Sequence, residues 1–218
     1  MDLSELSEEN VRNSLIEIIE KNNFRKGRAR ITFFDETSSY IWTFKSKRKT
    51  GFLITTADFR KIKKHFRLTV SPLRINSLSP LANIKSGNYL EKLLALKDAR
   101  VKGFDEAVCL NERGKVVSAS TANIFWVKNK QIFTSPLQTG CLAGTTREII
   151  LENFAVCEKR IGIDELLKAD EIFLTSSGIG VMKVGNLENN FYSSFSITEN
   201  LQKFLNDSIR KQNFLDLK

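Results

Sequence analysis

The sequence predicts a mixed α/β protein built from two domains. Segments in which apolar residues recur at helical spacing alternate with short segments rich in β-branched and aromatic residues, which is typical of this fold class. Two prolines mark residues 70–82 as an extended connection between a less regular first part and a more regular second part. We therefore expect a small N-terminal α/β domain over residues 1–82 and a larger domain over residues 83–218.

The first part predicts one helix followed by three strands. The helix should cover residues 7–22, because Ser7 can cap its start and the apolar residues that follow fall on one face. The strands are expected at 29–34, 39–44 and 51–56, where β-branched and aromatic residues are separated by polar turns.

The second part predicts helices and hairpins. Arg113-Gly114 and residues 128–130 have the composition of hairpin turns between segments of strand character. We expect hairpins over 106–120 and 123–136, helices at 88–102 and 146–154, strands at 171–177 and 182–187, and an amphipathic helix over 199–218 with Leu201, Leu205 and Ile209 inward.

Composition and charge limit the class of protein. A chain of 218 residues with 41% hydrophobic residues can bury a sizeable core. It has no apolar run of membrane-spanning length, and its acidic start is unlike a signal peptide, so we expect a cytoplasmic protein with no membrane partner. The three cysteines are widely spaced and the single histidine lies in a basic run, so we expect buried, reduced thiols and no metal site.

The net charge of +9 raises the question of nucleic-acid binding. Its densest sources are residues 44–49 and 59–67, where basic residues alternate with aromatic ones. The same alternation is typical of the solvent-facing side of strands or a short helix whose aromatic residues point inward. We therefore expect no nucleic-acid partner.

Three loops carry the residue types of a binding site. AGTTRE, 143–148, opens a predicted helix with a glycine and two threonines, so its free backbone N–H groups can hold an anion. TSSG, 175–178, places hydroxyls after a strand, where α/β proteins bind ligands. A lysine in a third loop, Lys85, can act as a nucleophile toward an aldehyde when other cations and burial favour its neutral form. A lysine beside two phosphate sites points to pyridoxal phosphate.

Six separated motifs occur in an order that resembles one enzyme family. They are LANIKSGNYL, GFDEAVCLNERGKVV, STANIFWV, TSPL, GCLAGTTRE and ADEIFLTSS, and they lie between about residue 8 and about residue 205. The sequence resembles the class IV, or fold-type-IV, pyridoxal-phosphate enzymes, which include branched-chain aminotransferases, D-amino-acid aminotransferases and aminodeoxychorismate lyases. The resemblance implies a two-domain fold-type-IV architecture and a homodimer.

The resemblance also implies roles for particular residues. Lys85 matches the lysine that forms the internal Schiff base with the cofactor, and Tyr89 matches an aromatic residue that can hydrogen-bond the phenolic oxygen of the cofactor. Arg147 and Ser176 would support the phosphate loop or contact substrate. The residues that would contact the phosphate are Gly144, Thr145, Thr146 and Ser177.

The sequence departs from the family pattern in two places. Most members have a glutamate that pairs with the pyridine nitrogen, and Ser118 stands at that position; a hydroxyl can hydrogen-bond the nitrogen but supplies no counter-charge. Members also usually carry more residues before the helix expected at 7–22, including a strand pair and an arginine that contacts the phosphate. The sequence therefore suggests a shortened small domain, either in a reduced member of the family or because part of that domain is missing.

Three functions remain open at this point. The first is transfer of an amino group between an amino acid and a 2-oxo acid, with Lys85 as the catalytic residue. The second is an aminodeoxychorismate lyase that releases pyruvate; Trp126 resembles lyase sequences, although a tryptophan on a strand is more often a core residue. The third is a non-catalytic descendant that serves as a binding or dimerisation module, for which Ser118 and the short N-terminal part are the arguments.

Overall fold

The computed structural model describes residues 6–24, 27–36, 49–58 and 63–211, with the side chains of 209–211 outside the description. The chain forms two compact units, residues 1–61 and residues 62–218. Sequence analysis placed the boundary near residue 82 instead. The difference arises because the first part of the expected connection, residues 70–75, belongs to a strand of the second unit.

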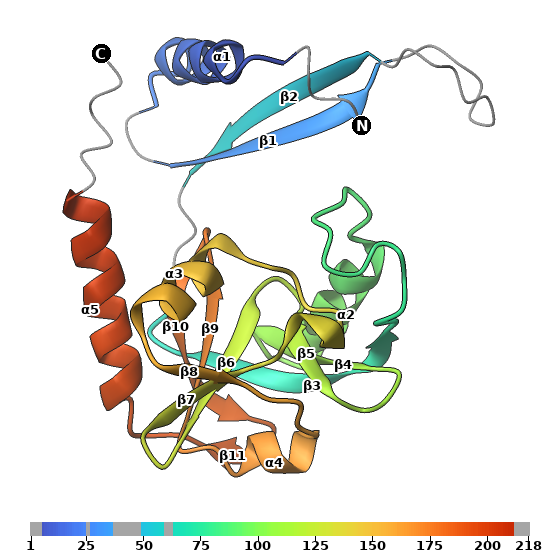
Figure 1. Ribbon diagram of the computed structural model, residues 1–218, viewed down its shortest axis with the longest axis vertical. Helices are drawn as coiled ribbons and strands as arrows, with labels where there is room; N and C mark the ends of the chain where they lie inside the picture. Colours follow the sequence, from blue (N-terminus) through green and yellow to red (C-terminus); the bar gives the residue numbers. More distant parts are fainter. Residues whose placement is uncertain (1–5, 25–26, 37–48, 59–62, 212–218) are drawn as a thin grey trace. The chain divides into compact units, whose positions relative to one another are not determined.

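In its described residues the first unit has one helix and one pair of antiparallel strands (Figure 1). Helix α1, Glu8–Lys21, is capped as predicted, because the Ser7 hydroxyl accepts a hydrogen bond from the backbone N–H of Asn10 at 3.1 Å. Strands β1, Arg28–Asp35, and β2, Thr50–Ala57, pair antiparallel over their whole length. The strand predicted at 39–44 lies outside the described residues.

The second unit is built on one mixed sheet of nine strands (Figure 1). The strand order is β5-β4-β3-β10-β9-β6-β7-β8, and β11 pairs with β10 beside this path. The strands are β3 Phe66–Ile75, β4 Glu106–Asn111, β5 Val116–Ala119, β6 Asn123–Lys128, β7 Gln131–Thr134, β8 Val156–Glu158, β9 Glu171–Ser176, β10 Gly180–Leu187 and β11 Asn190–Phe191.

Strand β3 explains why the boundary differs from the prediction. It lies between β4 and β10 and pairs parallel with both, so it is central to the sheet. Its register with β4 shifts between Val70 and Arg74, where Pro72 removes a backbone donor and interrupts regular pairing. The two prolines that suggested a linker therefore mark a bulge in a strand and the loop after it.

The two predicted hairpins are present. Strands β4 and β5 pair antiparallel around the Arg113-Gly114 turn, where Gly114 has φ of +69°. Strands β6 and β7 pair in register from Phe125 with Thr134 to Lys128 with Gln131. The intervening Asn129 and Lys130 both have positive φ, +50° and +64°, which is the geometry that two-residue hairpin turns require.

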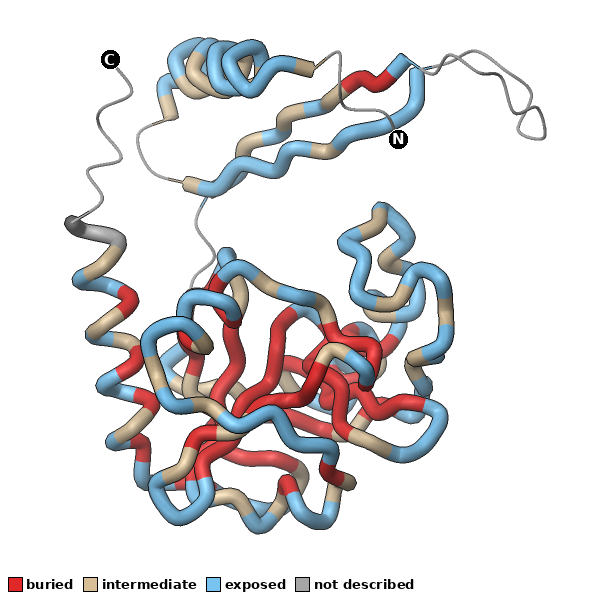
Figure 2. Tube along the Cα trace, in the orientation of Figure 1, coloured by how far each residue is buried: buried red, intermediate tan, exposed pale blue. Residues whose placement is uncertain are grey.

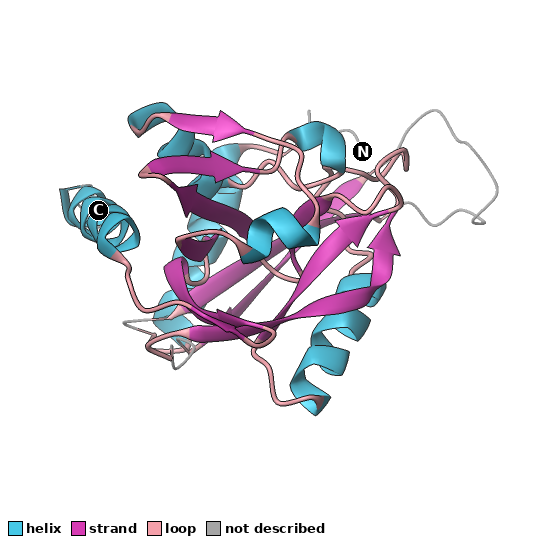
Figure 3. Ribbon diagram, turned by 90° about the horizontal axis from the view of Figure 1, so that it is seen from below, coloured by secondary structure: helices cyan, strands magenta, loops and turns pink. Residues whose placement is uncertain are grey.

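The sheet curls so that its inner face packs on itself, while helices cover its outer face (Figure 3). Figure 2 shows that buried residues of the second unit concentrate on its strands. The largest apolar cluster joins the inner faces of β3, β4, β5, β6, β9 and β10. Trp126 belongs to this cluster and stacks on Phe133 at 5.9 Å between ring centroids, so it is a core residue.

Two smaller clusters attach the helices to the outer face. Helix α2, Leu90–Val101, buries three residues of small or medium size against β4. Helices α3, Thr145–Asn153, and α5, Ser196–Lys211, pack on the faces of β6, β9 and β10. Leu201 and Leu205 of α5 are buried as predicted, and the side chain of Ile209 lies outside the description. The remaining helices are η1, Leu137–Thr139, and α4, Ile163–Leu167.

Helix α5 begins three residues earlier than predicted because a buried carboxylate caps it. Glu171, at the start of β9, is 3% exposed and accepts hydrogen bonds from the backbone N–H groups of Ile197 and Thr198 at 3.0 and 2.9 Å. The hydroxyls of Ser196 and Thr198 also donate to it. A capping side chain that is distant in the sequence cannot be recognised from local patterns.

Among the described residues, no helix is both long enough and apolar enough to cross a bilayer. The three cysteines are free; Cys109 and Cys141 are buried, as expected, and Cys157 is exposed, contrary to the expectation of three buried thiols.

Replacing Glu171 by alanine should lower the free energy of unfolding by about 2–3 kcal/mol, because the first amides of α5 lose their buried acceptor. Urea denaturation followed by circular dichroism measures the loss. Glu199→Ala is the matched control, since Glu199 lies in the first turn of the same helix but its side chain is 61% exposed and pairs with Lys183. It should cost less than about 1 kcal/mol. Equal losses for both variants would contradict the capping role.

Candidate active site

An anion cradle lies at the start of helix α3. Gly144 is the N-cap residue with extended backbone angles, φ −79° and ψ 140°, and no side chain caps the helix. The first intrahelical hydrogen bond joins the N–H of Glu148 to the carbonyl of Gly144 at 2.9 Å. The N–H groups of Thr145, Thr146 and Arg147 precede that bond, in the positions where helix amides lack intrahelical acceptors and attract anions.

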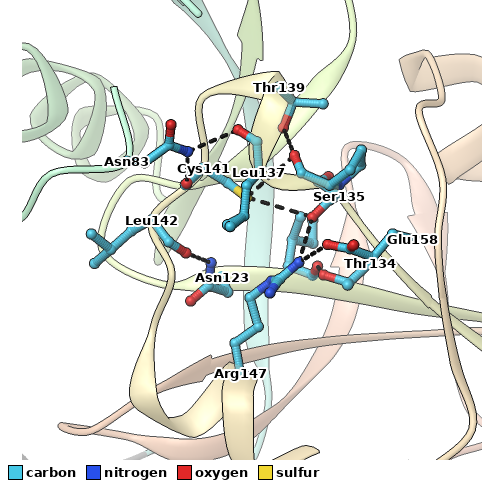
Figure 4. A network of polar contacts seen from close by, with 12 residues as sticks. Asn83, Asn123, Thr134, Ser135, Leu137, Thr139, Cys141, Leu142, Arg147 and Glu158 are labelled. Atoms are coloured by element: carbon cyan, nitrogen blue, oxygen red, sulfur yellow. Dashed lines mark hydrogen bonds and ion pairs between the residues drawn. The ribbon is translucent and has the colours of Figure 1, made fainter. Parts of the chain in front are cut away.

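Asn123, the first residue of β6, holds the loop that leads into this cradle, residues 135–144, which we call the cradle loop. Its Nδ2 donates to the carbonyl of Leu142 at 2.7 Å (Figure 4). A Cβ on Gly144 would lie 2.3 Å from Asn123 Oδ1, which is closer than real Cβ contacts allow. Any other residue at position 144 would therefore have to displace the Asn123 side chain, so this packing favours glycine.

The end of β9 lies beside the same cradle. Asn123 and Thr175 are direct partners in the antiparallel pairing of β6 and β9, so their side chains share a face of the sheet. Thr175 is fully buried and its Oγ1 has no hydrogen-bond partner among the described residues. Ser176 is half-buried and Ser177 is exposed in the turn that follows. The two loops singled out in the sequence are thus brought together by one strand pair.

Lys85 lies in the loop between β3 and α2, residues 76–89, which we call the lysine loop. Its side chain is paired with Tyr89. Its Nζ donates to Tyr89 Oη at 2.8 Å and lies 5.3 Å from the centre of the Tyr89 ring. Tyr89 is the N-cap residue of α2, so the first turn of that helix fixes the position of the hydroxyl. The amine is solvent-exposed and held by one side chain.

The same loop is tied to the loop that leads into the cradle. Asn83 Nδ2 donates to the carbonyls of Leu137 and Cys141 at 2.8 and 2.6 Å (Figure 4). The two loops also approach closely at Gly140, which has φ of +97°, since an added Cβ there would lie 3.2 Å from the Cα of Ser77. Asn83 was not among the residues predicted for the site, although it lies only two residues before Lys85 in the sequence.

Ser118 is buried on β5 and its hydroxyl has no hydrogen-bond partner among the described residues. It lies opposite Cys109 of β4, so both side chains share the face of the sheet that α2 covers. Burial raises the pKa of the Cys109 thiol to about 12, which keeps the thiol neutral at physiological pH. An unpaired buried hydroxyl is costly, so Ser118 is able to receive a polar atom of a ligand.

Arg147 directs its guanidinium toward Ser135 and Glu158 (Figure 4). It is 5% exposed, and its guanidinium donates to the carbonyl of Ser135 at 3.2 Å and pairs with Glu158 of β8. Of the two roles suggested for it, support of the loop agrees with these contacts. A buried arginine with a protein carboxylate partner cannot be told from an anion-binding arginine by sequence alone.

Glu106, a second buried carboxylate, was missed by sequence reasoning. It lies at the start of β4, is 3% exposed, and accepts a hydrogen bond from the Thr121 hydroxyl in the turn between β5 and β6. Burial raises the pKa of this carboxyl group. Glu106 thus stabilises the turn between Ser118 and Asn123 by accepting the Thr121 hydrogen bond.

A cavity of about 350 Å³ opens on the Tyr89 side of the lysine loop, which is the size range of small-molecule sites. Tyr89, Asn83 and Leu142 line it, together with two cationic residues, Arg74 and Lys92. Lys85, Ser118 and the cradle residues do not line it, so it adjoins the predicted site rather than enclosing it.

Comparison with known proteins identifies the family. The family model for amino-transferase class IV matches residues 3–187, so the chain belongs to the class IV aminotransferase family. It is 37% identical over 126 residues to a branched-chain-amino-acid aminotransferase of Pseudomonas aeruginosa, covering 54% of this chain and 41% of the relative. It is 32% identical over 126 residues to an aminodeoxychorismate lyase of Vibrio harveyi, covering 56% of this chain and 44% of the relative.

A solved structure agrees with this assignment. The branched-chain aminotransferase of Thermoproteus uzoniensis superposes with a TM-score of 0.82 at 26% identity, covering 94% of this chain and 72% of that one. The predicted fold-type-IV architecture is thereby confirmed. The chain spans about half, or less, of the length of the curated relatives that it matches.

Gly144→Ala should lower the free energy of unfolding by about 1–3 kcal/mol, because the new Cβ must displace Asn123 from the loop. Chemical denaturation measures the change. Gly178→Ala is the matched control, since nothing lies within 4 Å of an added Cβ there, and its effect should stay within about 0.5 kcal/mol. A Gly144 variant as stable as the Gly178 variant would show that the loop does not depend on this contact.

Proposed function

We propose that the protein is a pyridoxal-phosphate-dependent aminotransferase that moves an amino group between an amino acid and a 2-oxo acid. The observation that carries the proposal is the placement of Lys85. Its amine is held by Tyr89 in a loop that Asn83 joins to the anion cradle of α3. Family membership makes pyridoxal phosphate the expected cofactor.

The described residues fit this cofactor. Its phosphate would be held by the amides of Thr145 and Thr146 behind Gly144, with the exposed hydroxyl of Ser177 beside them. The unpaired Ser118 hydroxyl offers a hydrogen bond to a ring atom. When bound, pyridoxal phosphate supplies an aldehyde that condenses with amines and a ring that withdraws electrons.

Lys85 would have two tasks. Its Nζ would first hold the cofactor covalently; once released by the substrate amine, it would remove the proton from the substrate Cα and later return a proton. Tyr89 Oη accepts a hydrogen bond from that nitrogen, so it would orient the amine between these tasks. Ser118 supplies no negative charge, and the site would therefore stabilise a carbanion less than one with a carboxylate there.

The lyase reaction is the second candidate, because an aminodeoxychorismate lyase is among the relatives. Trp126 is a buried core residue, so its presence is explained by packing and does not by itself favour the lyase. Release of pyruvate from aminodeoxychorismate without an acceptor acid would favour the lyase. Formation of a new amino acid only when a 2-oxo acid is added would favour the transaminase. A purified protein that catalyses neither reaction and does not bind pyridoxal phosphate would leave the non-catalytic alternative.

Covalent labelling tests the central assignment. Reduction with borohydride in the presence of pyridoxal phosphate, followed by peptide mapping, should place the label on Lys85. Lys85→Ala should lose the label and nearly all turnover, whereas Lys97→Ala, on the exposed side of α2, should retain both. A label on Lys92 or Lys97 in the wild-type protein would end the assignment.

Ser118→Glu should raise transaminase turnover roughly ten- to a hundredfold, because a carboxylate beside a protonated ring nitrogen stabilises it by about 1.5–3 kcal/mol. The affinity for pyridoxal phosphate, measured by equilibrium dialysis, should rise as well. Ser118→Gln has nearly the same size without the charge and is the control. A gain shared by both variants, or a gain in neither, would mean that residue 118 does not face the nitrogen.

We also propose that the protein forms a homodimer through α2. The helix exposes four large apolar residues, with exposed fractions between 46% and 79%: Leu90, Leu93, Leu94 and Val101. Leu93→Asp should weaken self-association at least tenfold in light scattering over a concentration series. Phe191→Asp, which changes a still more exposed apolar residue on β11, should leave it unchanged. A monomeric wild-type protein at all concentrations would refute the dimer.

A further inference from the structure

Asn83 forms the hydrogen bonds that join the lysine loop to the cradle loop. Its Nδ2 donates to two carbonyls, those of Leu137 and Cys141 (Figure 4). The base of the lysine loop is anchored separately, where the backbone N–H and hydroxyl of Ser77 donate to Glu112 at 2.9 and 2.7 Å. Asn83 therefore sets the position of the far part of the loop, two residues before Lys85.

The cradle loop is held from both sides by asparagine amides. Asn83 reaches the carbonyl of Cys141, and Asn123 reaches the next carbonyl, that of Leu142. These carbonyls directly precede the Ala143-Gly144 entry to α3. One asparagine belongs to the sheet and the other to the lysine loop, so the cradle loop is the part that both share.

The backbone of Asn83 requires this residue type. Its φ is +66°, in the left-handed region that favours glycine and, among residues with side chains, asparagine and aspartate. Asparagine alone in that group supplies an amide donor. The conformation and the two hydrogen bonds together select asparagine at this position.

We propose that Asn83 is a positioning residue that fixes the distance between the Lys85 amine and the anion cradle. The proposal rests on the proposed function. When Lys85 captures pyridoxal phosphate, its nitrogen adds to the aldehyde carbon and one water leaves, while the phosphate stays in the cradle. Both ends of the ligand must then be reached at once. Loss of Asn83 should weaken the covalent step and leave phosphate binding nearly intact, because Asn123 still holds Leu142.

Two probes separate these effects. The affinity for pyridoxal phosphate depends on both phosphate binding in the cradle and bond formation with Lys85. 4′-Deoxypyridoxine 5′-phosphate has the ring and phosphate but no aldehyde, so its affinity depends on the cradle without the covalent step. Asn83→Gly keeps the backbone conformation and removes the donor, and Asn83→Asp keeps the shape and replaces the donor by an acceptor. In both variants the dissociation constant of pyridoxal phosphate should rise about tenfold, and that of the deoxy probe less than about threefold.

Asn153→Asp is the matched control. Asn153 also donates from Nδ2 to a backbone carbonyl, that of Ile149 at 2.8 Å, but at the other end of α3. It should leave both constants unchanged. Equal losses for the two probes in the Asn83 variants, or no loss for pyridoxal phosphate, would overturn the proposal.

Hydrogen exchange distinguishes failure of the proposal from failure of the proposed function. If borohydride places no label on Lys85 of the wild-type protein, the proposed function fails. The effect of the Asn83 hydrogen bonds on the two loops can still be measured. Exchange at residues 84–88 and 141–144 should then be faster in Asn83→Gly than in the wild type or Asn153→Asp. Unchanged exchange would overturn the positioning role of Asn83.

Discussion

The approach of Asn123 to Gly144 is the contact on which the candidate site depends. Asn123 Nδ2 donates to the carbonyl of Leu142, while its Oδ1 lies only 2.3 Å from the place that a Cβ on residue 144 would take. The start of α3 is thereby fixed to the first residue of β6, whose neighbour in the sheet is the end of β9. The paired ends of β6 and β9, two interior strands of the sheet, thus position a helix terminus and a serine-rich turn, and loop composition alone would not do so.

Much of the second unit was predictable because its signals are local. The turns at Arg113-Gly114 and at Asn129-Lys130, and the glycine before α3, are each specified by a few adjacent residues. The candidate site residues were also visible in short motifs, and the structure brings Lys85 to Tyr89 and the cradle beside the end of β9. Family resemblance supplied their roles, which local physics does not.

The rest depended on contacts between distant parts of the chain. The parallel pairs of β3 gave no local signal, and its prolines suggested a linker. Arg147 follows a phosphate motif in the sequence, but its guanidinium forms an ion pair with Glu158. Glu171 caps a helix that begins 25 residues later in the sequence. Burial and partner choice decided each case, and neither can be read from neighbouring residues.

The central position of β3 also bears on how the protein is made. Its neighbour β4 follows it closely in the chain, whereas β10 is synthesised only after most of the second unit. Until then one side of β3 presents unpaired backbone groups, and such edges readily pair with other chains. We expect the growing chain to need protection on the ribosome during that interval, and the sheet to close in a late, slow step.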